Sequence, residues 1–292
     1  FRILEGKRVG LITNPTGVNS LFQSTIDILH NAPNVNLVAL FGPEHGVRGD
    51  VHAGDKVDNL TDKRNGLPVY SLYGATRKPT PEMLKGIDVL VYDIQDNGCR
   101  SFTYISTMGL AMEAAGEQGI EFVVLDRPNP LGGQKVEGNL AEPQFISFVS
   151  QFPIPYLYGL TCGELAQMIN TEKMIAAPCK LTVVKMKGWK RSMTWEKTGL
   201  PWIVASPHIP HKHSSYFYPV TGILGELGYL SIGVGYTLPF EMVGSPWINA
   251  EDLSTALNNL KLKGVYFRPI HFKPFYATFK GEQCQGVQIH IT

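Results

Sequence analysis

Short apolar segments alternate with amphipathic segments along the first half of the chain. The apolar segments are rich in Val, Leu and Ile, which is typical of strands buried on both faces of a parallel sheet. The segments between them carry apolar residues at helical spacing. These patterns predict strands at Val9–Thr13, Val35–Phe41, Val69–Leu72, Val89–Asp93 and Phe122–Asp126, one helix with Phe22, Ile26 and Leu29 on a face, and another with Ile105, Met108, Met112 and Ala115.

The pattern changes after about residue 138, where the regular alternation ends. Thr161–Glu164 has the S/T-x-x-E pattern of a capping box, so we interpret Glu164 as a structural residue at a helix start. A long segment at 201–246 is rich in Pro, His, Tyr and Gly. The remaining predicted elements are a strand at Leu181–Val184, a helix capped by Asn249 with Leu253, Leu257 and Leu260 facing inward, and an edge-type strand at Val287–Ile291.

These elements together predict an α/β fold with two domains. Residues 1–138 are expected to form a Rossmann-like, doubly wound and mostly parallel sheet, and residues 139–292 a second, smaller α+β domain. The chain begins and ends close to predicted strands, so we expect the natural protein to extend beyond both ends. The lack of a signal peptide within these residues therefore does not oppose export.

Composition and charge exclude several classes of function. The 26 basic and 25 acidic residues nearly cancel, whereas a protein that binds nucleic acid usually has a basic excess, so no nucleic-acid partner is expected. No apolar run is long enough to span a membrane. The four cysteines form no C-x-x-C pair, which argues against a zinc knuckle or a redox dithiol. The oligomeric state is not predicted.

Polar side chains gather where the predicted strands of the first domain end. Open parallel sheets bind ligands beyond the carboxyl ends of their strands, so residues at several strand ends converge on one rim. Clustered carboxylates with Asn, Arg, His and Tyr suit acid/base chemistry on a hydroxyl-rich neutral substrate. The rim comprises Asn14, Glu44, His45, Asp93, Gln95, Asp96, Asp126, Arg127 and Asn129, with Arg100 and Tyr104 on one face of the following helix start.

Cofactor and metal sites are not expected. No G-x-G-x-x-G follows the first strand and no phosphate-binding G-x-x-x-x-G-K-[ST] occurs, which disfavours a nicotinamide or ATP enzyme. His208, His211 and His213 lie close together, but no carboxylate accompanies them at helical spacing and prolines interrupt the segment. We interpret this segment as a loop that lines the cleft. An esterase or amidase is disfavoured because no G-x-S-x-G elbow is present.

Several long motifs lie along the chain and together carry a family likeness: Gly42–Gly49, Tyr92–Asp96, Arg100, Thr103–Met108, Asp126–Gly133, Gly159–Thr161, Gly163–Ala166, Pro239–Glu241 and Gly244–Ile248. These motifs resemble one family, the bacterial exo-β-N-acetylmuramidases of the NamZ type. The resemblance covers essentially the whole chain and implies a Rossmann-like domain, an auxiliary domain that closes the cleft, and a periplasmic or secreted location. It implies release of N-acetylmuramic acid from the non-reducing ends of peptidoglycan fragments, with Glu44 at the position of the family's proposed catalytic glutamate.

The chain departs from the family pattern in its second half. Ser206-Pro207-His208 stands where the family commonly has S-P-N, and Tyr229, Ile232 and Val234 replace an Asn, a Glu and an Arg. A non-catalytic or retuned relative that binds cell-wall glycan is therefore the alternative hypothesis.

The resemblance and the strand-end pattern together define the predicted site. Asp93, Asp96 and Asp126 remain open as candidates for the second carboxylate, and Asp126 with Arg127 could instead form a structural pair. The predicted catalytic residues are Glu44, His45, Asp93 and Asp126, and the predicted substrate-binding residues are Asn14, Gln95, Asp96, Arg100, Tyr104, Arg127, Asn129, Ser206 and His208.

Overall fold

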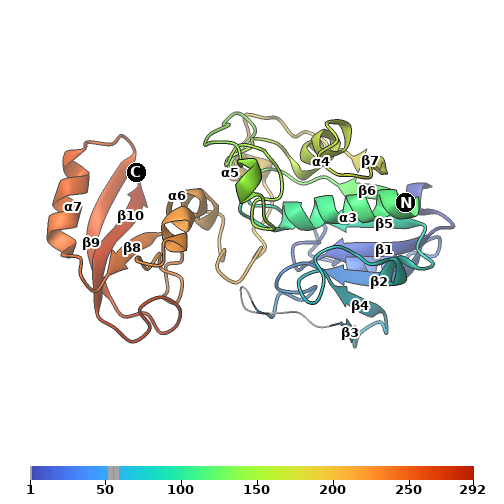
Figure 1. Cartoon of the computed structure of the whole chain (residues 1–292), viewed down its shortest axis with the longest axis horizontal. Coiled ribbons are helices and arrows are strands. Elements are labelled where there is room, and N and C mark those ends of the chain that lie inside the picture. The colour runs from blue at the N-terminus through green and yellow to red at the C-terminus, as the bar shows by residue number, and fades with distance from the viewer. Residues whose placement is uncertain (1, 52–54, 56–58) are drawn as a thin grey trace. The chain divides into compact units, whose positions relative to one another are not determined.

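A computed structural model describes residues 2–51, 55 and 59–292. The chain forms two compact units (Figure 1): unit 1 ends at Pro207 and unit 2 comprises His208–Thr292. The division therefore comes later than the boundary that we predicted near residue 138. The physical reason is β7 (Lys180–Val184), which we placed in the second domain but which pairs in parallel with β6 (Glu121–Leu125) and completes the sheet of unit 1.

Unit 1 contains a seven-stranded, mostly parallel sheet in the order β3-β4-β2-β1-β5-β6-β7. Only the pairing of β3 with β4 is antiparallel among these neighbours. The predicted fold class is thus confirmed, and all five strands predicted in the first half are present. The other strands are β1 (Arg8–Thr13), β2 (Asn36–Gly42), β3 (Leu60–Thr61), β4 (Pro68–Ser71) and β5 (Val89–Asp93).

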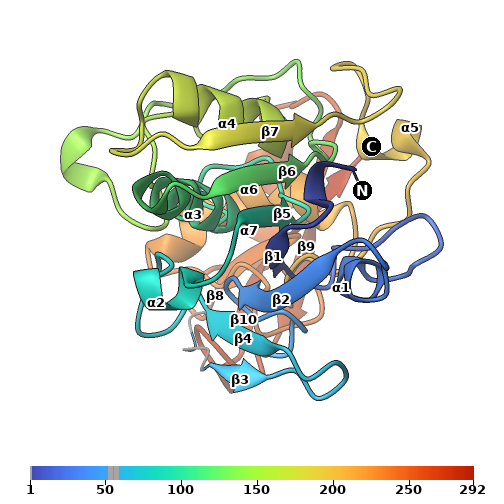
Figure 2. The same cartoon turned by 90° about the vertical axis from the view of Figure 1, so that its right-hand side faces the viewer.

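Helices cover both faces of this sheet, with α1 on one face and α2, α3 and α4 on the other (Figure 2). Phe22, which we predicted on one face of the first helix with Ile26 and Leu29, instead precedes α1, has a left-handed φ of 60° and is 60% exposed. Ser24 caps α1 and therefore fixes its start. The helical elements of unit 1 are η1 (Arg2–Leu4), α1 (Thr25–His30), α2 (Pro81–Leu84), α3 (Tyr104–Gln118), η2 (Pro143–Phe145), α4 (Cys162–Thr171) and α5 (Trp195–Thr198).

The two central strands, β1 and β5, hold the core of unit 1. Val9, Leu11, Val89 and Val91 are fully buried, and each such side chain contributes about 1.5–3 kcal/mol relative to exposure. From β1 the chain passes to β2 and β4 on one side, and it then returns to β5 on the other side. The strand order thus reverses at β1 and β5, and such a switch point is where open α/β sheets bind ligands.

Unit 2 is built on a three-stranded antiparallel sheet, β8-β10-β9. β10 lies in its centre, so our prediction of an edge strand at Val287–Ile291 was wrong. α7 packs on β9 and β10 and is capped by Asn249 as predicted, but Leu260 follows its last turn and is 62% exposed. The elements are α6 (Ser214–Glu226), β8 (Met242–Ser245), α7 (Ala250–Asn259), β9 (Val265–Phe272) and β10 (Cys284–Ile291).

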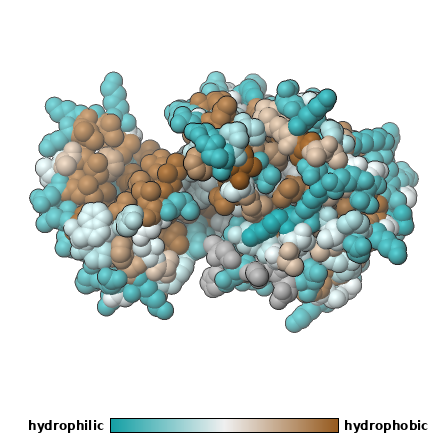
Figure 3. Space-filling model, viewed as in Figure 1, coloured by the Kyte–Doolittle hydropathy of each residue, from teal (hydrophilic) through white to brown (hydrophobic). Residues whose placement is uncertain are grey.

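Apolar side chains gather on one face of unit 2, over α6 (Figure 3). Val220, Ile223 and Leu227 follow one another at helical spacing and are 60%, 49% and 56% exposed. Phe217 and Thr221 lie on the buried side of the same helix. α6 therefore packs through one side and leaves an apolar strip at the surface.

Candidate active site

Glu44 lies in a tight turn that directly follows β2. The amide of Gly46 donates to the carbonyl of Pro43 at 2.9 Å, and His45 and Gly46 adopt left-handed φ angles of 72° and 75°. Such a conformation is uncommon for a residue other than glycine and costs about 1 kcal/mol or more. The turn returns Val47 to the core and leaves Glu44 half-buried at the rim of the sheet.

Two hydroxyl groups hold the carboxylate of Glu44. Thr103 Oγ1 donates to Glu44 Oε2 at 2.6 Å, and the Tyr73 hydroxyl also hydrogen-bonds the same side chain. Thr103 is the residue that caps α3, yet its side chain makes no cap bond to that helix. The hydroxyl of Thr103 is therefore used to orient Glu44. Burial, and secondarily the negative charge of Glu44, raise the pKa of Tyr73.

His45 faces inward beside Glu44. It is 6% exposed, and its Nδ1 lies 2.8 Å from the carbonyl oxygen of Val51. The ring thus links the turn to the segment that follows it. This contact is structural, and the catalytic role predicted for His45 stays a prediction.

Asn14 and Tyr104 meet at one main-chain oxygen. Asn14 Nδ2 and the Tyr104 hydroxyl both donate to the carbonyl of Ala205, at 3.3 and 2.6 Å. Burial raises the pKa of Tyr104, and the charges of Glu44 and Asp96 raise it further. These groups therefore share one electrostatic neighbourhood at the carboxyl ends of β1, β2 and β5.

Asp93 and Arg127 form an ion pair inside unit 1. Arg127 Nε lies 2.6 Å from Asp93 Oδ1, while Thr25 Oγ1 donates to Asp93 Oδ2 at 2.5 Å. Asp93 is only 2% exposed, and Arg127 also donates to the carbonyl of Val18 at 3.2 Å. The partner of Arg127 is thus Asp93 rather than the adjacent Asp126 that the sequence suggested. Both side chains are engaged by the protein itself.

Asp126 anchors the start of α4. Its Oδ1 accepts from the amide of Gly163 at 2.8 Å, and its Oδ2 accepts from Thr161 Oγ1 at 2.9 Å. Burial raises the pKa of Asp126 although these bonds lower it. Thr161 and Glu164 form a complete capping box, which confirms that Glu164 caps the helix. The contacts of Asp126 are those of a structural residue.

Asp96 is buried and carries a perturbed pKa. It is 4% exposed, and its Oδ2 accepts from the amide of Gly98 at 2.6 Å and from the Tyr158 hydroxyl. Burial raises the pKa of Asp96 to about 6, against the lowering effect of these bonds. Asp96 therefore lies in the interior of the rim, where protein groups enclose its carboxylate.

Two amide side chains, Gln95 and Asn129, tie neighbouring loops together. Gln95 Nε2 donates to the carbonyl of Pro128 at 2.8 Å. Asn129 Nδ2 donates to the carbonyl of Leu160 at 2.9 Å, and its Oδ1 accepts from the amide of Leu131 at 2.9 Å. Both amides therefore bridge the segments that follow β5 and β6.

Arg100 binds main-chain oxygens. Its Nη1 donates to the carbonyls of Asn139, at 2.6 Å, and Ile154, and its Nε donates to Ser150 Oγ at 2.6 Å. The guanidinium thus fastens the 139–154 segment to the start of α3. The substrate roles predicted for Arg100 and Arg127 stay predictions, and in the structure protein groups hold both side chains.

The two predicted residues of the later segment fall in different units. Ser206 belongs to unit 1 and is 9% exposed, whereas His208 begins unit 2, where its Nε2 contacts the Tyr276 hydroxyl. In the altered loop at 228–236, Tyr229 is 72% exposed and Ile232 is half-buried. The loop thus offers an aromatic side chain at the surface where the family pattern has an amide.

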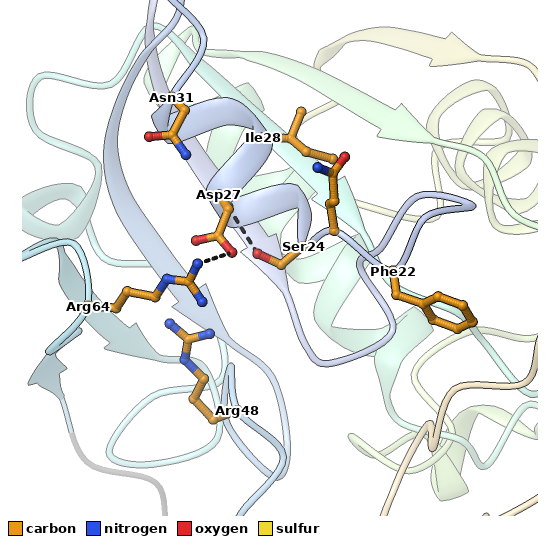
Figure 4. Close-up of a pocket in the computed structure, with 8 residues that line it drawn as sticks. Phe22, Ser24, Asp27, Ile28, Asn31, Arg48 and Arg64 are labelled. Atoms are coloured by element: carbon orange, nitrogen blue, oxygen red, sulfur yellow. Dashed lines mark hydrogen bonds and ion pairs between the residues drawn. The ribbon is translucent and has the colours of Figure 1, made fainter.

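A cavity of about 570 Å³ lies on the α1 side of unit 1 (Figure 4). Arg64 pairs with Asp27 at 3.1 Å across this cavity, and Arg48, from the motif that follows Glu44, pairs with the buried Asp62 at 2.6 Å. Arg48 therefore ties the Glu44 segment to the turn between β3 and β4. The lining residues are Phe22, Gln23, Ser24, Asp27, Ile28, Asn31, Arg48 and Arg64.

Tyr73 and Thr103 are site residues that our reasoning from the sequence missed. Tyr73 follows β4, a strand end that we did not include in the rim although the same topological rule applies to it. Thr103 belongs to a motif that resembles the family, but its contact with Glu44 spans 59 positions and has no local signal. Applying the strand-end rule to β4 predicts Tyr73 as a rim residue, but it does not predict Thr103.

Neither a metal centre nor a membrane span is found in the part of the chain that the structure describes. No three His, Cys, Asp or Glu side chains there are grouped as metal ligands would be. No described helix is long and apolar enough to cross a bilayer.

Comparison with known families gives matches to both units. Residues 9–213 match the N-terminal domain, and residues 216–292 the C-terminal domain, of the exo-β-N-acetylmuramidase NamZ family. The chain belongs to this family. It is similar to the peptidoglycan β-N-acetylmuramidase NamZ of Bacillus subtilis (strain 168), with 53% identity over 289 residues, 99% of this chain and 69% of that relative.

Two crystal structures of DUF1343 family proteins from Bacteroides fragilis NCTC 9343 have the same fold as this NamZ family member. One has a TM-score of 0.94 and 70% identity, and the match covers 100% of this chain and 74% of that chain. The other has a TM-score of 0.81 and 32% identity, with coverage of 99% and 73%. The fold of this chain is thus shared with experimentally solved proteins.

Proposed function

We propose that this protein is an exo-β-N-acetylmuramidase that releases N-acetylmuramic acid from the non-reducing ends of peptidoglycan fragments. Membership of the NamZ family and the similarity to the Bacillus subtilis β-N-acetylmuramidase support this activity. The observation that carries the proposal is the position of Glu44. It stands half-buried at the rim of the sheet, in a strained turn, with its carboxylate held by Thr103 and Tyr73.

In this proposal Glu44 acts as the general acid or base on the glycosidic bond. Glycosidases need a carboxyl group within reach of the leaving oxygen or of the attacking water. Asp93 and Asp96 are almost completely buried, and the contacts of Asp126 fasten α4. These internal bonds favour structural roles for the three aspartates and support Glu44 as the carboxyl group that meets the substrate.

The substrate also bears on where the protein acts. Peptidoglycan lies outside the cytoplasmic membrane, so we propose that the protein works in the periplasm or outside the cell. Detection of the native protein in the periplasmic or culture fraction supports this location, and confinement to the cytoplasm contradicts it.

Hydrolysis of a chromogenic β-N-acetylmuramide tests the activity and the role of Glu44 together. We expect Glu44→Gln to lower kcat by at least about 100-fold, the usual contribution of a general acid or base. Glu5→Gln is a matched control, because Glu5 is exposed and precedes β1, at the opposite end of that strand. Normal hydrolysis by Glu44→Gln contradicts the role of Glu44. Glycan binding by a wild-type protein that never cleaves supports the alternative of a glycan-binding relative.

A further inference from the structure

An arginine that our reasoning from the sequence did not single out lies one tyrosine away from Glu44. Arg77 places its guanidinium carbon 3.4 Å from the centre of the Tyr73 ring and 4.5 Å from the centre of the Phe148 ring. The two rings stand 5.8 Å apart and are inclined at 56°. The hydroxyl of the same Tyr73 bonds Glu44. The Tyr73 side chain therefore contacts both the cation and the proposed catalytic carboxylate.

The surroundings of Arg77 leave it with donor capacity. Stacking on aromatic rings occupies the faces of a guanidinium and leaves its N–H groups to point outward in the plane. Arg77 Nη1 is buried and donates to no acceptor among the described residues, and no acidic side chain described by the structure forms an ion pair with Arg77. A buried charged donor without a partner is costly. An anionic ligand would satisfy it.

Arg77 contrasts with the two arginines predicted to bind the sugar. Arg100 donates to two carbonyls and a serine, and Arg127 is paired with Asp93. The N–H groups of both are therefore used on protein acceptors. Arg77 is held by the two rings and bonds the Tyr73 hydroxyl, but its Nη1 has no acceptor among the described residues.

We propose that Arg77 binds the lactyl carboxylate of N-acetylmuramic acid and thereby selects this sugar over N-acetylglucosamine. The two sugars differ by the lactyl ether at C3, whose carboxylate is the only charged group on the ring. A guanidinium recognises a carboxylate through two parallel N–H···O bonds. The inference rests on the proposed function and specifies its substrate selection.

The test compares two substrates that differ only in this charge. Wild type, Arg77→Gln and Arg77→Lys are assayed on the chromogenic muramide and on its lactyl carboxamide. We expect Arg77→Gln to lower kcat/KM on the carboxylate about 10- to 100-fold, mainly through KM, because a hydrogen-bonded charge pair is lost. Activity on the carboxamide should stay within about twofold, and Arg77→Lys should recover part of the loss because it keeps the charge. Arg64→Gln is the matched control, because Arg64 is an exposed arginine that pairs with Asp27. It should leave kcat/KM on both substrates unchanged.

The outcomes separate this inference from the proposed function. Equal losses on both substrates show that Arg77 only supports the fold, and no loss on either shows that it does not meet the substrate; each overturns the inference. A wild type that cleaves neither substrate refutes the proposed function. Calorimetric binding of free N-acetylmuramic acid to wild type and Arg77→Gln then still decides the inference, since it predicts weaker binding by the variant and equal binding contradicts it.

Discussion

The buried carboxyl group of Asp96 makes the stability of unit 1 depend on pH in an unusual direction. Burial raises its pKa from 3.8 to about 6 in the folded protein. The folded state therefore holds this proton more tightly than the unfolded state does, and the stability that protonation provides is present at low pH. It is lost as the pH rises from the unfolded pKa through the folded pKa. Most carboxylates that are paired in folded proteins behave in the opposite way.

The size of the effect follows from the shift. A difference of about 2 pKa units corresponds to about 3 kcal/mol, of which about 2 kcal/mol falls between pH 4.5 and pH 8. Asp96→Asn removes the titration but keeps the shape and an oxygen that accepts from Gly98 and Tyr158. We therefore expect the difference in unfolding free energy, wild type minus variant, to fall by about 2 kcal/mol between these two pH values.

Urea unfolding followed by tryptophan fluorescence measures this difference. Trp189, Trp195 and Trp202 lie in unit 1, so the signal reports chiefly on the unit that contains Asp96. The comparison with the variant cancels the titration of all other groups. A difference between wild type and Asp96→Asn that is constant from pH 4.5 to pH 8, or that rises with pH, refutes the reasoning.

Two further substitutions test the contacts around the rim. Thr103→Val should lower kcat/KM on the muramide by about 10- to 100-fold, because the charged carboxylate of Glu44 loses a hydrogen bond. The melting temperature should stay almost unchanged because Thr103 makes no cap bond. Activity within twofold of wild type contradicts the orienting role. Arg127→Met should lower the unfolding free energy by about 3–5 kcal/mol because it leaves the buried Asp93 without its cation. Adding Asp93→Asn to the same chain should recover part of the lost unfolding free energy. A loss of unfolding free energy below about 1 kcal/mol in Arg127→Met, measured by urea unfolding, argues against a stabilising role of this pair.

The strands of unit 1 were predictable because burial on both faces leaves a continuous apolar signature. Periodicity could not tell which sheet a strand joins, so β7 was assigned to the second domain although it extends the first sheet. The same limit applies to β10. Its alternating residues suggested an edge, but Gly286 allows close approach of a neighbour, since a Cβ atom there would lie 2.0 Å from the carbonyl oxygen of Val243.

Helix α6 was hidden by its own sequence. Pro219 lies inside the helix, and proline normally ends a helical pattern. Pro219 has no N–H, so the helix forms around it without the bond that this position would otherwise donate to the carbonyl four residues earlier. The exposed apolar strip on its outer side also removes the polar face by which an amphipathic helix is recognised.

The rim residues were predictable as a group, but their partners were not. Topology places strand ends together, which is why Glu44, Asp93 and Asp126 could be assigned to one edge of the sheet. Which carboxylate faces substrate depends on contacts between distant positions, such as Asp93 with Arg127 and Asp126 with Gly163. No local pattern encodes these pairs.

Product analysis on a defined oligosaccharide tests the central claim most directly. A tetrasaccharide that begins with N-acetylmuramic acid at its non-reducing end and alternates with N-acetylglucosamine is incubated with the full chain, and the products are identified by mass spectrometry. An exo-β-N-acetylmuramidase should release free N-acetylmuramic acid and leave a trisaccharide that begins with N-acetylglucosamine, and the Glu44→Gln variant should release neither. Disaccharides from internal cleavage, N-acetylglucosamine as the first product, or an intact tetrasaccharide would contradict the account.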